Sequence, residues 1–141
     1  MQKIQFYSLD REPVLKDRTR LKIFIENLFT KEKKSIGGLS YIFCSDEHLL
    51  KINQKFLKHD FYTDVITFDL SSSNIEIQGE VYLSIDRIKD NAKQLGVSFK
   101  EELHRVIFHG ALHLCGYKDK NRGDIAKMRE KEEKYISEYF T

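Results

Sequence analysis

Residues 98–120, SFKEELHRVIFHGALHLCGYKDK, carry the most informative pattern in the sequence. Its first residues, Ser98 and Glu101, match the S-x-x-E capping box that begins many helices. Apolar side chains then recur at helical spacing as far as Cys115, and Gly116 is a residue type that commonly ends a helix. The stretch therefore predicts a helix that reaches Cys115 and carries two histidines on one face.

Shorter patterns on both sides of this helix predict the remaining elements. Strands are indicated by alternating or β-rich runs, and helices by apolar residues at helical spacing with capping residues at their ends. In the first half of the chain, the predicted elements are a strand near residue 4, a helix over 13–29, a strand over 39–44 after a break at Gly37 and Gly38, and a helix from Ser45 with Leu49, Ile52 and Phe56 on one face. A hairpin of 63–70 and 76–85, joined by SSSN, follows, and then a helix over 86–95 that Gly96 ends. After the long helix come a polar connection over 118–124 and a last helix with Ile125, Met128 and Ile136. This order favours an α+β fold in which a small mixed β-sheet of about four strands packs against about five helices.

The composition is that of one domain spanning residues 1–141. A net charge of +2 gives no indication of the broad basic face that many nucleic-acid-binding proteins carry, but it allows a local basic patch. The two cysteines, Cys44 and Cys115, provide no disulfide framework. Since no apolar run is long enough to cross a membrane, we expect a soluble, cytoplasmic protein with no membrane partner.

His109 and His113 lie one turn apart on the same face of the predicted helix. An α-helix turns by about 100° per residue, so the two imidazoles are about 40° apart and can bind one ion. Gly116 lets the chain fold back past them, and Asp119 could then supply a third ligand. The spacing H-x-x-x-H-x-x-G-x-x-D has the geometry of the metzincin motif. It favours a metal site over the alternative, a helix whose histidines hydrogen-bond locally.

Gly110 argues against a protease at this site. In the H-E-x-x-H motif the glutamate is the general base, and Gly110 occupies its position. Glycine in mid-helix costs up to about 1 kcal/mol relative to alanine, so a closely packed neighbour is expected to need the space. A hydrolase would take its base from elsewhere or rely on a metal-bound water, whose pKa is lowered.

The segment HGALHLCGYKDK resembles the H-G-x-L-H-L-x-G-Y-D-H motif of the YbeY family, which are metal-dependent endoribonucleases and ribosomal RNA maturation factors. A second segment agrees with this resemblance. It comprises IN at 52–53, Phe56, Asp60 and TDVITF at 63–68, and it is similar to the family's L-N-x-x-Y-R … D-x-P-T-D-V-L-S-F. The triplet GEV at 79–81 is similar to the family's G-D-I strand, so matches extend from about residue 49 to 130.

The resemblance implies an α+β fold with one divalent metal ion, usually zinc, held by His109, His113 and Asp119. It implies single-stranded RNA as the substrate, with a role in trimming the 3′ end of small-subunit ribosomal RNA and in ribosome quality control. The ribosome or its small subunit is then the expected partner. Beyond a metal-bound water, the resemblance names no catalytic group for this chain.

Three positions depart from the family pattern. Asp119 replaces a family histidine, and two histidines with one carboxylate match both a catalytic zinc site and the facial triad of non-haem iron. Leu57 replaces the family arginine and cannot bind a phosphate, so the adjacent Lys58 is the candidate to replace it. Tyr62 replaces a proline, a change that we interpret as structural.

Other polar residues near the motifs have ordinary interpretations. Asp64 is expected to bind local backbone groups, Glu80 to pair within its strand, and Glu102 and Arg105 to form a surface ion pair on the histidine face. Basic groups that could hold an RNA backbone at the mouth of the site are Lys58, Lys118, Lys120 and Arg122. Two alternatives to the nuclease remain, a zinc metalloprotease and a non-enzymatic ribosome assembly factor with a structural metal.

Overall fold

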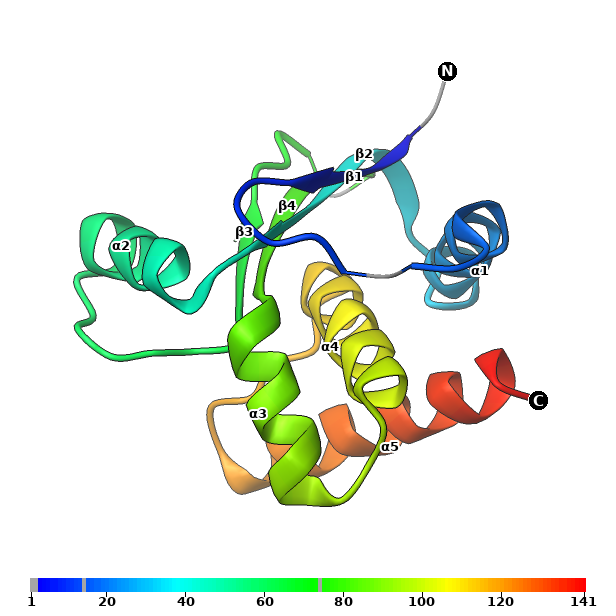
Figure 1. Cartoon of the computed structure of the whole chain (residues 1–141). Helices are drawn as coiled ribbons and strands as arrows, with labels where there is room; N and C mark the ends of the chain where they lie inside the picture. The colour runs from blue at the N-terminus through cyan, green and yellow to red at the C-terminus, as the bar shows by residue number, and fades with distance from the viewer. Residues whose placement is uncertain (1–2, 14, 74) are drawn as a thin grey trace.

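The computed structural model describes residues 3–13, 15–73 and 75–141, which form a mixed sheet with helices on both faces (Figure 1). This is the α+β fold that the sequence predicts, with four strands and five helices in the described residues. The elements are β1 (Ile4–Ser8), α1 (Arg18–Lys31), β2 (Ser35–Cys44), α2 (Asp46–Leu57), β3 (Val65–Asp69), β4 (Glu76–Ser84), α3 (Ile85–Leu95), α4 (Phe99–Leu114) and α5 (Arg122–Tyr139).

The sheet has the strand order β1-β2-β4-β3. β1, β2 and β4 are parallel, whereas β3 pairs antiparallel with β4 at one edge. The predicted hairpin is therefore confirmed, although Asn74 in its connection lies outside the described residues. Alternate residues of each strand face opposite sides of the sheet, and each side carries its own apolar cluster.

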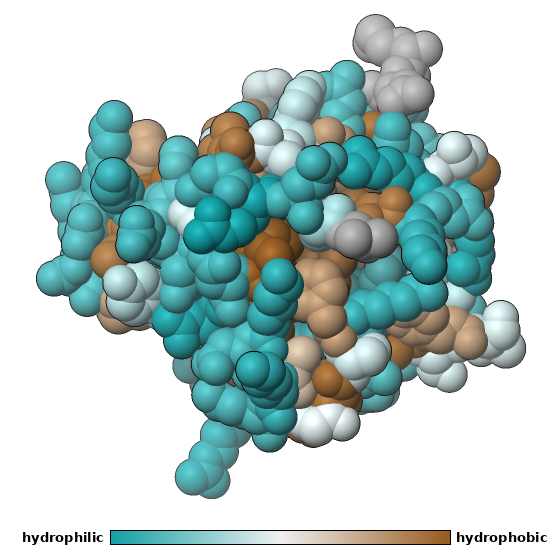
Figure 2. All heavy atoms as spheres, viewed as in Figure 1, coloured by the Kyte–Doolittle hydropathy of each residue, from teal (hydrophilic) through white to brown (hydrophobic). Residues whose placement is uncertain are grey.

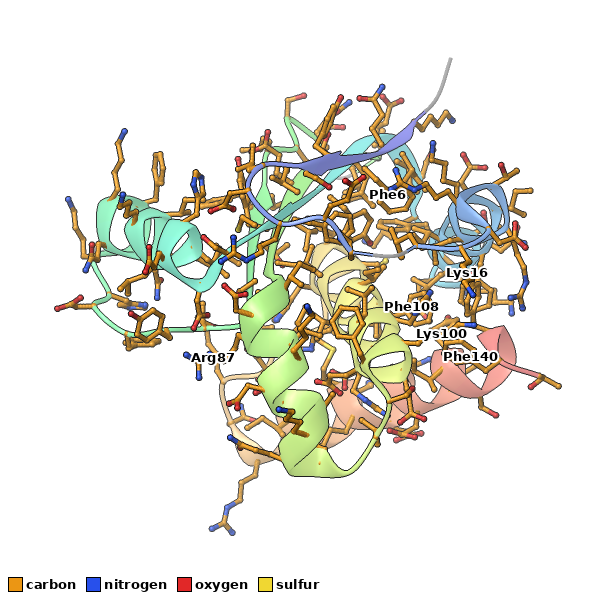
Figure 3. The ribbon with its side chains drawn as sticks, in the orientation of Figure 1. Phe6, Lys16, Arg87, Lys100, Phe108 and Phe140 are labelled. Carbon is orange, nitrogen blue, oxygen red and sulfur yellow. The ribbon has the colours of Figure 1, made fainter. Side chains whose placement is uncertain are left out.

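The helix α4 lies at the centre of the larger cluster, beneath the sheet in Figure 1. It contacts β3 and β4 above it and α1, α3 and α5 around it. Phe108 on this helix is fully buried, and its ring lies 5.1 Å from that of Phe24 on α1 (Figure 3). Because α4 has neighbours on most sides, its orientation relative to the sheet is strongly constrained.

The helix α2 packs on the opposite face of the sheet, where Leu49 joins Cys44 and Ile66 in the smaller cluster. The predicted start at Ser45 is confirmed, since its hydroxyl accepts a hydrogen bond from the amide of His48. Phe56, which the helical spacing places on the same face as Leu49 and Ile52, is 59% exposed. The last turn of α2 reaches the edge strand β3, beyond which no further strand lies in the described sheet.

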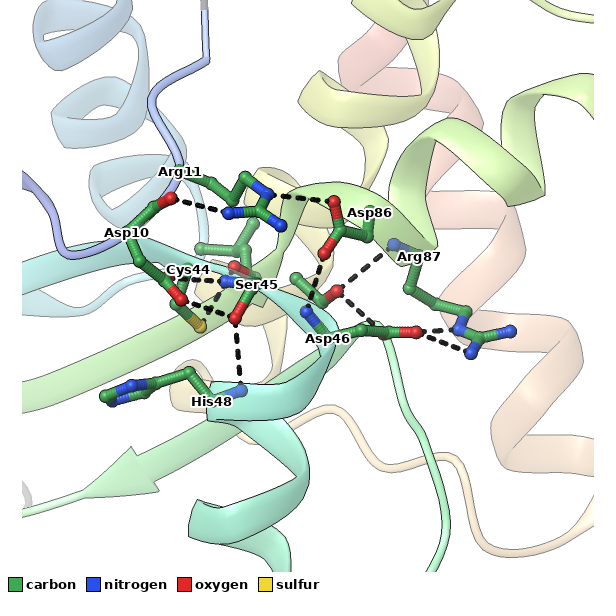
Figure 4. Close-up of polar contacts among 10 residues, drawn as sticks. Asp10, Arg11, Cys44, Ser45, Asp46, His48, Asp86 and Arg87 are labelled. Carbon is green, nitrogen blue, oxygen red and sulfur yellow. Dashed lines mark hydrogen bonds and ion pairs between the residues drawn. The ribbon is translucent and has the colours of Figure 1, made fainter.

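A polar network fixes the helices that follow the carboxyl ends of β2 and β4 (Figure 4). Asp10 accepts hydrogen bonds from the backbone and the hydroxyl of Ser45. Asp46 pairs with Arg87 at 2.7 Å, and Asp86 accepts from the Asp46 amide. These carboxylates at helix N-termini satisfy amide groups that have no partner inside the helix.

Three predicted boundaries are wrong. The helix α1 begins at Arg18 instead of near residue 13, because Asp17 takes a left-handed conformation and caps it; Val14 lies outside the described residues. Gly37 and Gly38 do not break the chain but form an irregularity inside β2, which begins at Ser35. The last helix begins at Arg122, inside the predicted connection, because Asn121 caps it.

The surface in Figure 2 is largely hydrophilic, with apolar groups in small separate patches. This distribution matches a chain that buries its large apolar residues in two clusters. None of the helices in the described part of the chain combines the length and apolar character that crossing a membrane requires.

Candidate metal centre

Two glycines let α4 lie unusually close to β4. A Cβ atom on Gly110 of the helix would stand 2.7 Å from a methyl group of Val81 on the strand. Conversely, a Cβ atom on Gly79 of the strand would stand 2.7 Å from a methyl group of Leu114 on the helix. The expectation that Gly110 makes room for a neighbour is confirmed. The helix residues in these contacts, Gly110 and Leu114, each directly follow one of the histidines, so the contacts fix the direction in which the histidine face points.

Each histidine is oriented by an acceptor at its Nδ1 atom. Nδ1 of His113 lies 2.9 Å from the backbone oxygen of Tyr117, and Nδ1 of His109 lies 2.6 Å from a carboxylate oxygen of Glu132. A backbone oxygen can only accept, so Nδ1 of His113 carries a proton and its Nε2 holds a lone pair in the neutral ring. The same arrangement at His109 leaves its Nε2 available as well.

The two Nε2 atoms point at Asp119. Its carboxylate oxygen Oδ2 lies 3.2 Å from Nε2 of His113 and 3.6 Å from Nε2 of His109. One donor atom from each of the three residues lies within 4.8 Å of the other two. This donor set fits a divalent ion, since two imidazoles and one carboxylate with oriented rings are typical of catalytic metal sites.

The loop after α4 brings Asp119 to the histidines. Gly116 has a φ of 108°, which side chains other than glycine rarely adopt, so the turn depends on this residue. The hydroxyl of Tyr117 donates to Glu32, the residue that follows α1, at 2.6 Å, which anchors the loop to the core. Cys115 is buried in the larger apolar cluster and is not one of the grouped donors, as the helical spacing predicts.

Glu132 is the residue that the sequence analysis missed. It lies between His109 and Arg105, with one oxygen 2.6 Å from Nδ1 of His109 and the other 4.0 Å from the guanidinium. Its position in the sequence gives one signal, because it follows Met128 by four residues and precedes Tyr135 by three on the buried face of α5. A charged residue on an apolar stripe indicates a buried polar partner on another element.

Arg105 is surrounded by carboxylates. It donates to Glu101 at 3.3 Å and to Glu133, and its Nε atom lies 3.4 Å from Glu102. The predicted pairing of Glu102 with Arg105 is confirmed. The prediction that this pair lies on the surface is wrong, because Glu102 is only 4% exposed. The packing of α3 and α5 against α4 covers this face of the helix. Arg105 therefore serves mainly to neutralise buried acids beside Glu132.

Burial dominates the electrostatics of the acids near the histidines. It raises the pKa of Glu102 to about 7, although the charge of Arg105 opposes the shift. It also raises the pKa of Asp64, which accepts a hydrogen bond from Asn91 at 3.2 Å, against the attraction of His109. Burial lowers the pKa of His109, but the hydrogen bond to Glu132 outweighs it, so that the pKa is raised overall. A cation bound beside these acids would lower their pKa values again, because it attracts the ionised carboxylates.

A cleft of about 1000 Å³ opens beside the three donors. It is lined by His109, His113 and Asp119, by Asp64, Glu102, Arg105, Arg129 and Glu132, and by Leu57, His59 and Phe61 from the segment between α2 and β3. Lys58, Lys118, Lys120 and Arg122 are not among the lining residues, so the basic groups in the wall of the cleft are Arg105 and Arg129. Glu80 lies outside the cleft and accepts from Tyr82 at 3.2 Å, as expected for a strand pair.

Comparison with known proteins gives matches over nearly the whole chain. The family model described as "Endoribonuclease YbeY" matches residues 10–140. A Cytophaga hutchinsonii protein named Endoribonuclease YbeY is 48% identical over 134 residues, which cover 95% of this chain and 94% of that protein. The protein of the same name from Porphyromonas gingivalis is 46% identical over 139 residues, which cover 96% of this chain and 89% of that protein.

One solved structure agrees with both sequence and fold. The solution structure of TM1509 from Thermotoga maritima superimposes with a TM-score of 0.61 and 29% sequence identity. The match covers 97% of this chain and 89% of that chain. The span that the family model matches, residues 10–140, includes the histidine helix, the turn at Gly116 and Asp119.

Proposed function

This chain belongs to the YbeY family of metal-dependent endoribonucleases, and from that premise we propose that it cuts single-stranded RNA in the cleft beside His109, His113 and Asp119. One observation carries the assignment to this site. The Nε2 atoms of both histidines converge on the Asp119 carboxylate, while Glu132 and the Tyr117 carbonyl hold their Nδ1 atoms. This is the arrangement of a metal site whose ligands are oriented in advance.

The residues of the chain have separable roles in this proposal. His109, His113 and Asp119 hold one divalent ion, which we propose to be zinc, and such an ion supplies a Lewis acid next to the scissile phosphate when bound. Glu132 keeps the His109 ring in place. Arg129, on the wall of the cleft, offers positive charge to the RNA backbone.

The biological substrate that we propose is ribosomal RNA. The family resemblance supports a role at the 3′ end of small-subunit RNA and in ribosome quality control, with the small subunit or the ribosome as partner and the cytoplasm as the place of action. The curated relatives carry the name endoribonuclease, which supports RNA as the substrate class. The residues 1–141 act as one domain in this proposal, since one apolar cluster includes residues from Ile4 to Tyr139.

The test compares RNA with protein as the substrate. The purified protein should cut single-stranded RNA slowly and leave casein intact, because Gly110 offers no general base and its place is packed against Val81. The His113→Ala variant, purified identically, is the matched control and should lose the nuclease activity. Nuclease activity that disappears on further purification while the metal remains bound would refute the proposal, and hydrolysis of casein would favour the metalloprotease alternative.

We also propose that Lys58 makes one phosphate contact at the rim of the cleft. It ends α2 with a left-handed φ of 59° and stands between Leu57 and His59, which both line the cleft. The Lys58→Ala variant should bind RNA more weakly regardless of sequence, and the log–log salt slope should become shallower by slightly less than about one unit. Binding is measured by fluorescence anisotropy at several salt concentrations.

Two further variants make this test specific. Lys58→Asn removes the charge but tolerates the left-handed backbone, so it should reproduce the effect of Lys58→Ala. Lys51→Ala removes an exposed lysine earlier on α2 and should leave the salt slope unchanged. An unchanged slope in both Lys58 variants would make this lysine an ordinary surface residue.

A further inference from the structure

The segment between α2 and β3 places aromatic rings in the wall of the cleft. His59 and Phe61 line the cleft together with Leu57. Leu57 occupies the position at which the YbeY family motif has an arginine. Phe61 is 56% exposed, and the neighbouring Tyr62 is 50% exposed. Exposing rings of this size to water is unfavourable, so their presence in a binding cleft calls for a ligand with an apolar surface.

This segment is held firmly, although it contains no regular secondary structure. Asn53 is 1% exposed, and its side-chain amide donates to the backbone oxygen of Phe61 at 2.9 Å. The backbone amide of His59 donates to the backbone oxygen of Asn53 at 3.2 Å. Nearby, Arg87 reaches from α3 (Figure 3) and its guanidinium lies 5.2 Å from the centre of the Tyr62 ring. The rings are therefore presented in a defined position before any ligand binds.

His59 and Phe61 already form a small stack. Their ring centres are 5.0 Å apart and their planes differ by 20°, which is an offset stacked arrangement. His59 thus covers part of Phe61, while more than half of the Phe61 surface remains open. A further flat ring can extend this stack without displacing a protein side chain.

We propose that Phe61, backed by His59, is a stacking platform for one unpaired base of the single-stranded RNA that enters the cleft. Unpaired bases bind proteins by stacking on aromatic side chains, whereas paired bases are already stacked within their helix. The platform shares a cleft with the His109, His113 and Asp119 donors and with Arg129, so one strand can meet all of them. The inference rests on the proposed function and specifies how that site selects unpaired RNA.

The alternative occupant is an apolar side chain of a partner protein. The shared cleft favours RNA, because the same walls carry the metal-binding donors and a basic group suited to phosphates. Stacking also compensates for the arginine that Leu57 replaces. Since a stacked base releases no counterion, this contribution to binding should be nearly independent of salt, unlike a phosphate contact.

The first experiment measures binding of a fluorescently labelled 2′-O-methyl RNA octamer to the metal-loaded protein. Phe61→Ala should weaken binding about tenfold without changing the salt slope, and Phe61→Tyr should restore most of the affinity. Phe56→Ala is the matched control, because Phe56 is exposed to a similar extent, 59%, but does not line the cleft. It should bind like the unaltered protein.

Octamers that lack one base at a time locate the stacked position. One abasic position should weaken binding to the unaltered protein by the same factor as Phe61→Ala, and it should have no further effect on that variant. Loss of additivity at a single position identifies a base in contact with the ring.

A second experiment uses the absence of tryptophan from the sequence. Phe61→Trp introduces the only tryptophan of the chain at the platform. Its emission should be quenched when the octamer binds, whereas the tryptophan emission of Phe56→Trp should remain unchanged. The platform would be refuted if Phe61→Ala bound the octamer as tightly as the unaltered protein. It would also be refuted if the emission of Phe61→Trp and Phe56→Trp were quenched equally. Either result would leave an apolar side chain of a partner protein as the alternative occupant. If the unaltered protein cuts single-stranded RNA in the nuclease assay and binds the octamer, the proposed function stands even when the platform is refuted. If it neither cuts nor binds RNA, the proposed function and the platform are both refuted.

Discussion

Replacing Asp119 with alanine should remove the bound metal almost as completely as replacing His113. The two histidines alone provide two donors, which is fewer than the three protein ligands usual in catalytic zinc sites. We propose Asp119 as the third donor, since its Oδ2 atom lies 3.2 Å from Nε2 of His113. The measurement is metal per chain by elemental analysis after gel filtration, and circular dichroism confirms that the variants are folded.

Two variants sharpen this test. Asp119→His should keep a full equivalent of metal, because imidazole is a good zinc ligand and the change restores the family motif. Asp124→Ala should also keep the metal, since Asp124 lies in the first turn of α5 and does not line the cleft. A full equivalent in Asp119→Ala, with loss in His113→Ala, would mean that another residue is the third ligand.

Replacing Glu132 with glutamine should weaken metal binding by about 10- to 100-fold, the range found when a carboxylate behind a metal-binding histidine is altered. Glutamine has nearly the same shape, but it lacks the negative charge that makes the His109 ring a stronger donor. The 2.6 Å contact and the burial of Glu132, which is 8% exposed, make this interaction hard for water to replace. Competition with a chromophoric chelator gives the affinity.

Glu133→Gln is the matched control for this variant. Glu133 is the next residue on α5 and also pairs with Arg105, but it has a side chain that is 65% exposed. Its replacement should change metal affinity little, because the pair is close to solvent. Equal affinities of Glu132→Gln and the unaltered protein would show that Glu132 has no influence on the ion and serves only to satisfy a buried nitrogen.

The sequence predicts the parts of the site that depend on local geometry. The spacing of His109 and His113 and the turn at Gly116 follow from the helical period and from the freedom of glycine, so they can be derived without tertiary structure. Glu132 could not be placed in this way, because its contact with His109 joins α5 to α4 across 23 positions in the sequence. The burial of Glu102 likewise depends on α3 and α5, which cover the helix face that periodicity alone leaves exposed.

The boundaries that the sequence analysis misplaced have a common physical origin. Pro13 suits the first turn of a helix, but the cap at Asp17 determines where α1 begins. Gly37 and Gly38 resemble a turn in composition, yet pairing with β4 keeps them within β2. In both cases a specific hydrogen-bonding partner overrides a residue preference of modest size.

The close contacts at Gly110 and Gly79, between α4 and β4, constrain two of the candidate ligands but not the third. The close packing of α4 on β4 fixes the direction of His109 and His113, because a larger residue at Gly110 or Gly79 would collide with Val81 or Leu114. Asp119 belongs to an exposed loop, where a different side chain disturbs no packing. With the proposed ligand set, a substitution at this single surface position would alter the metal preference without disturbing the core.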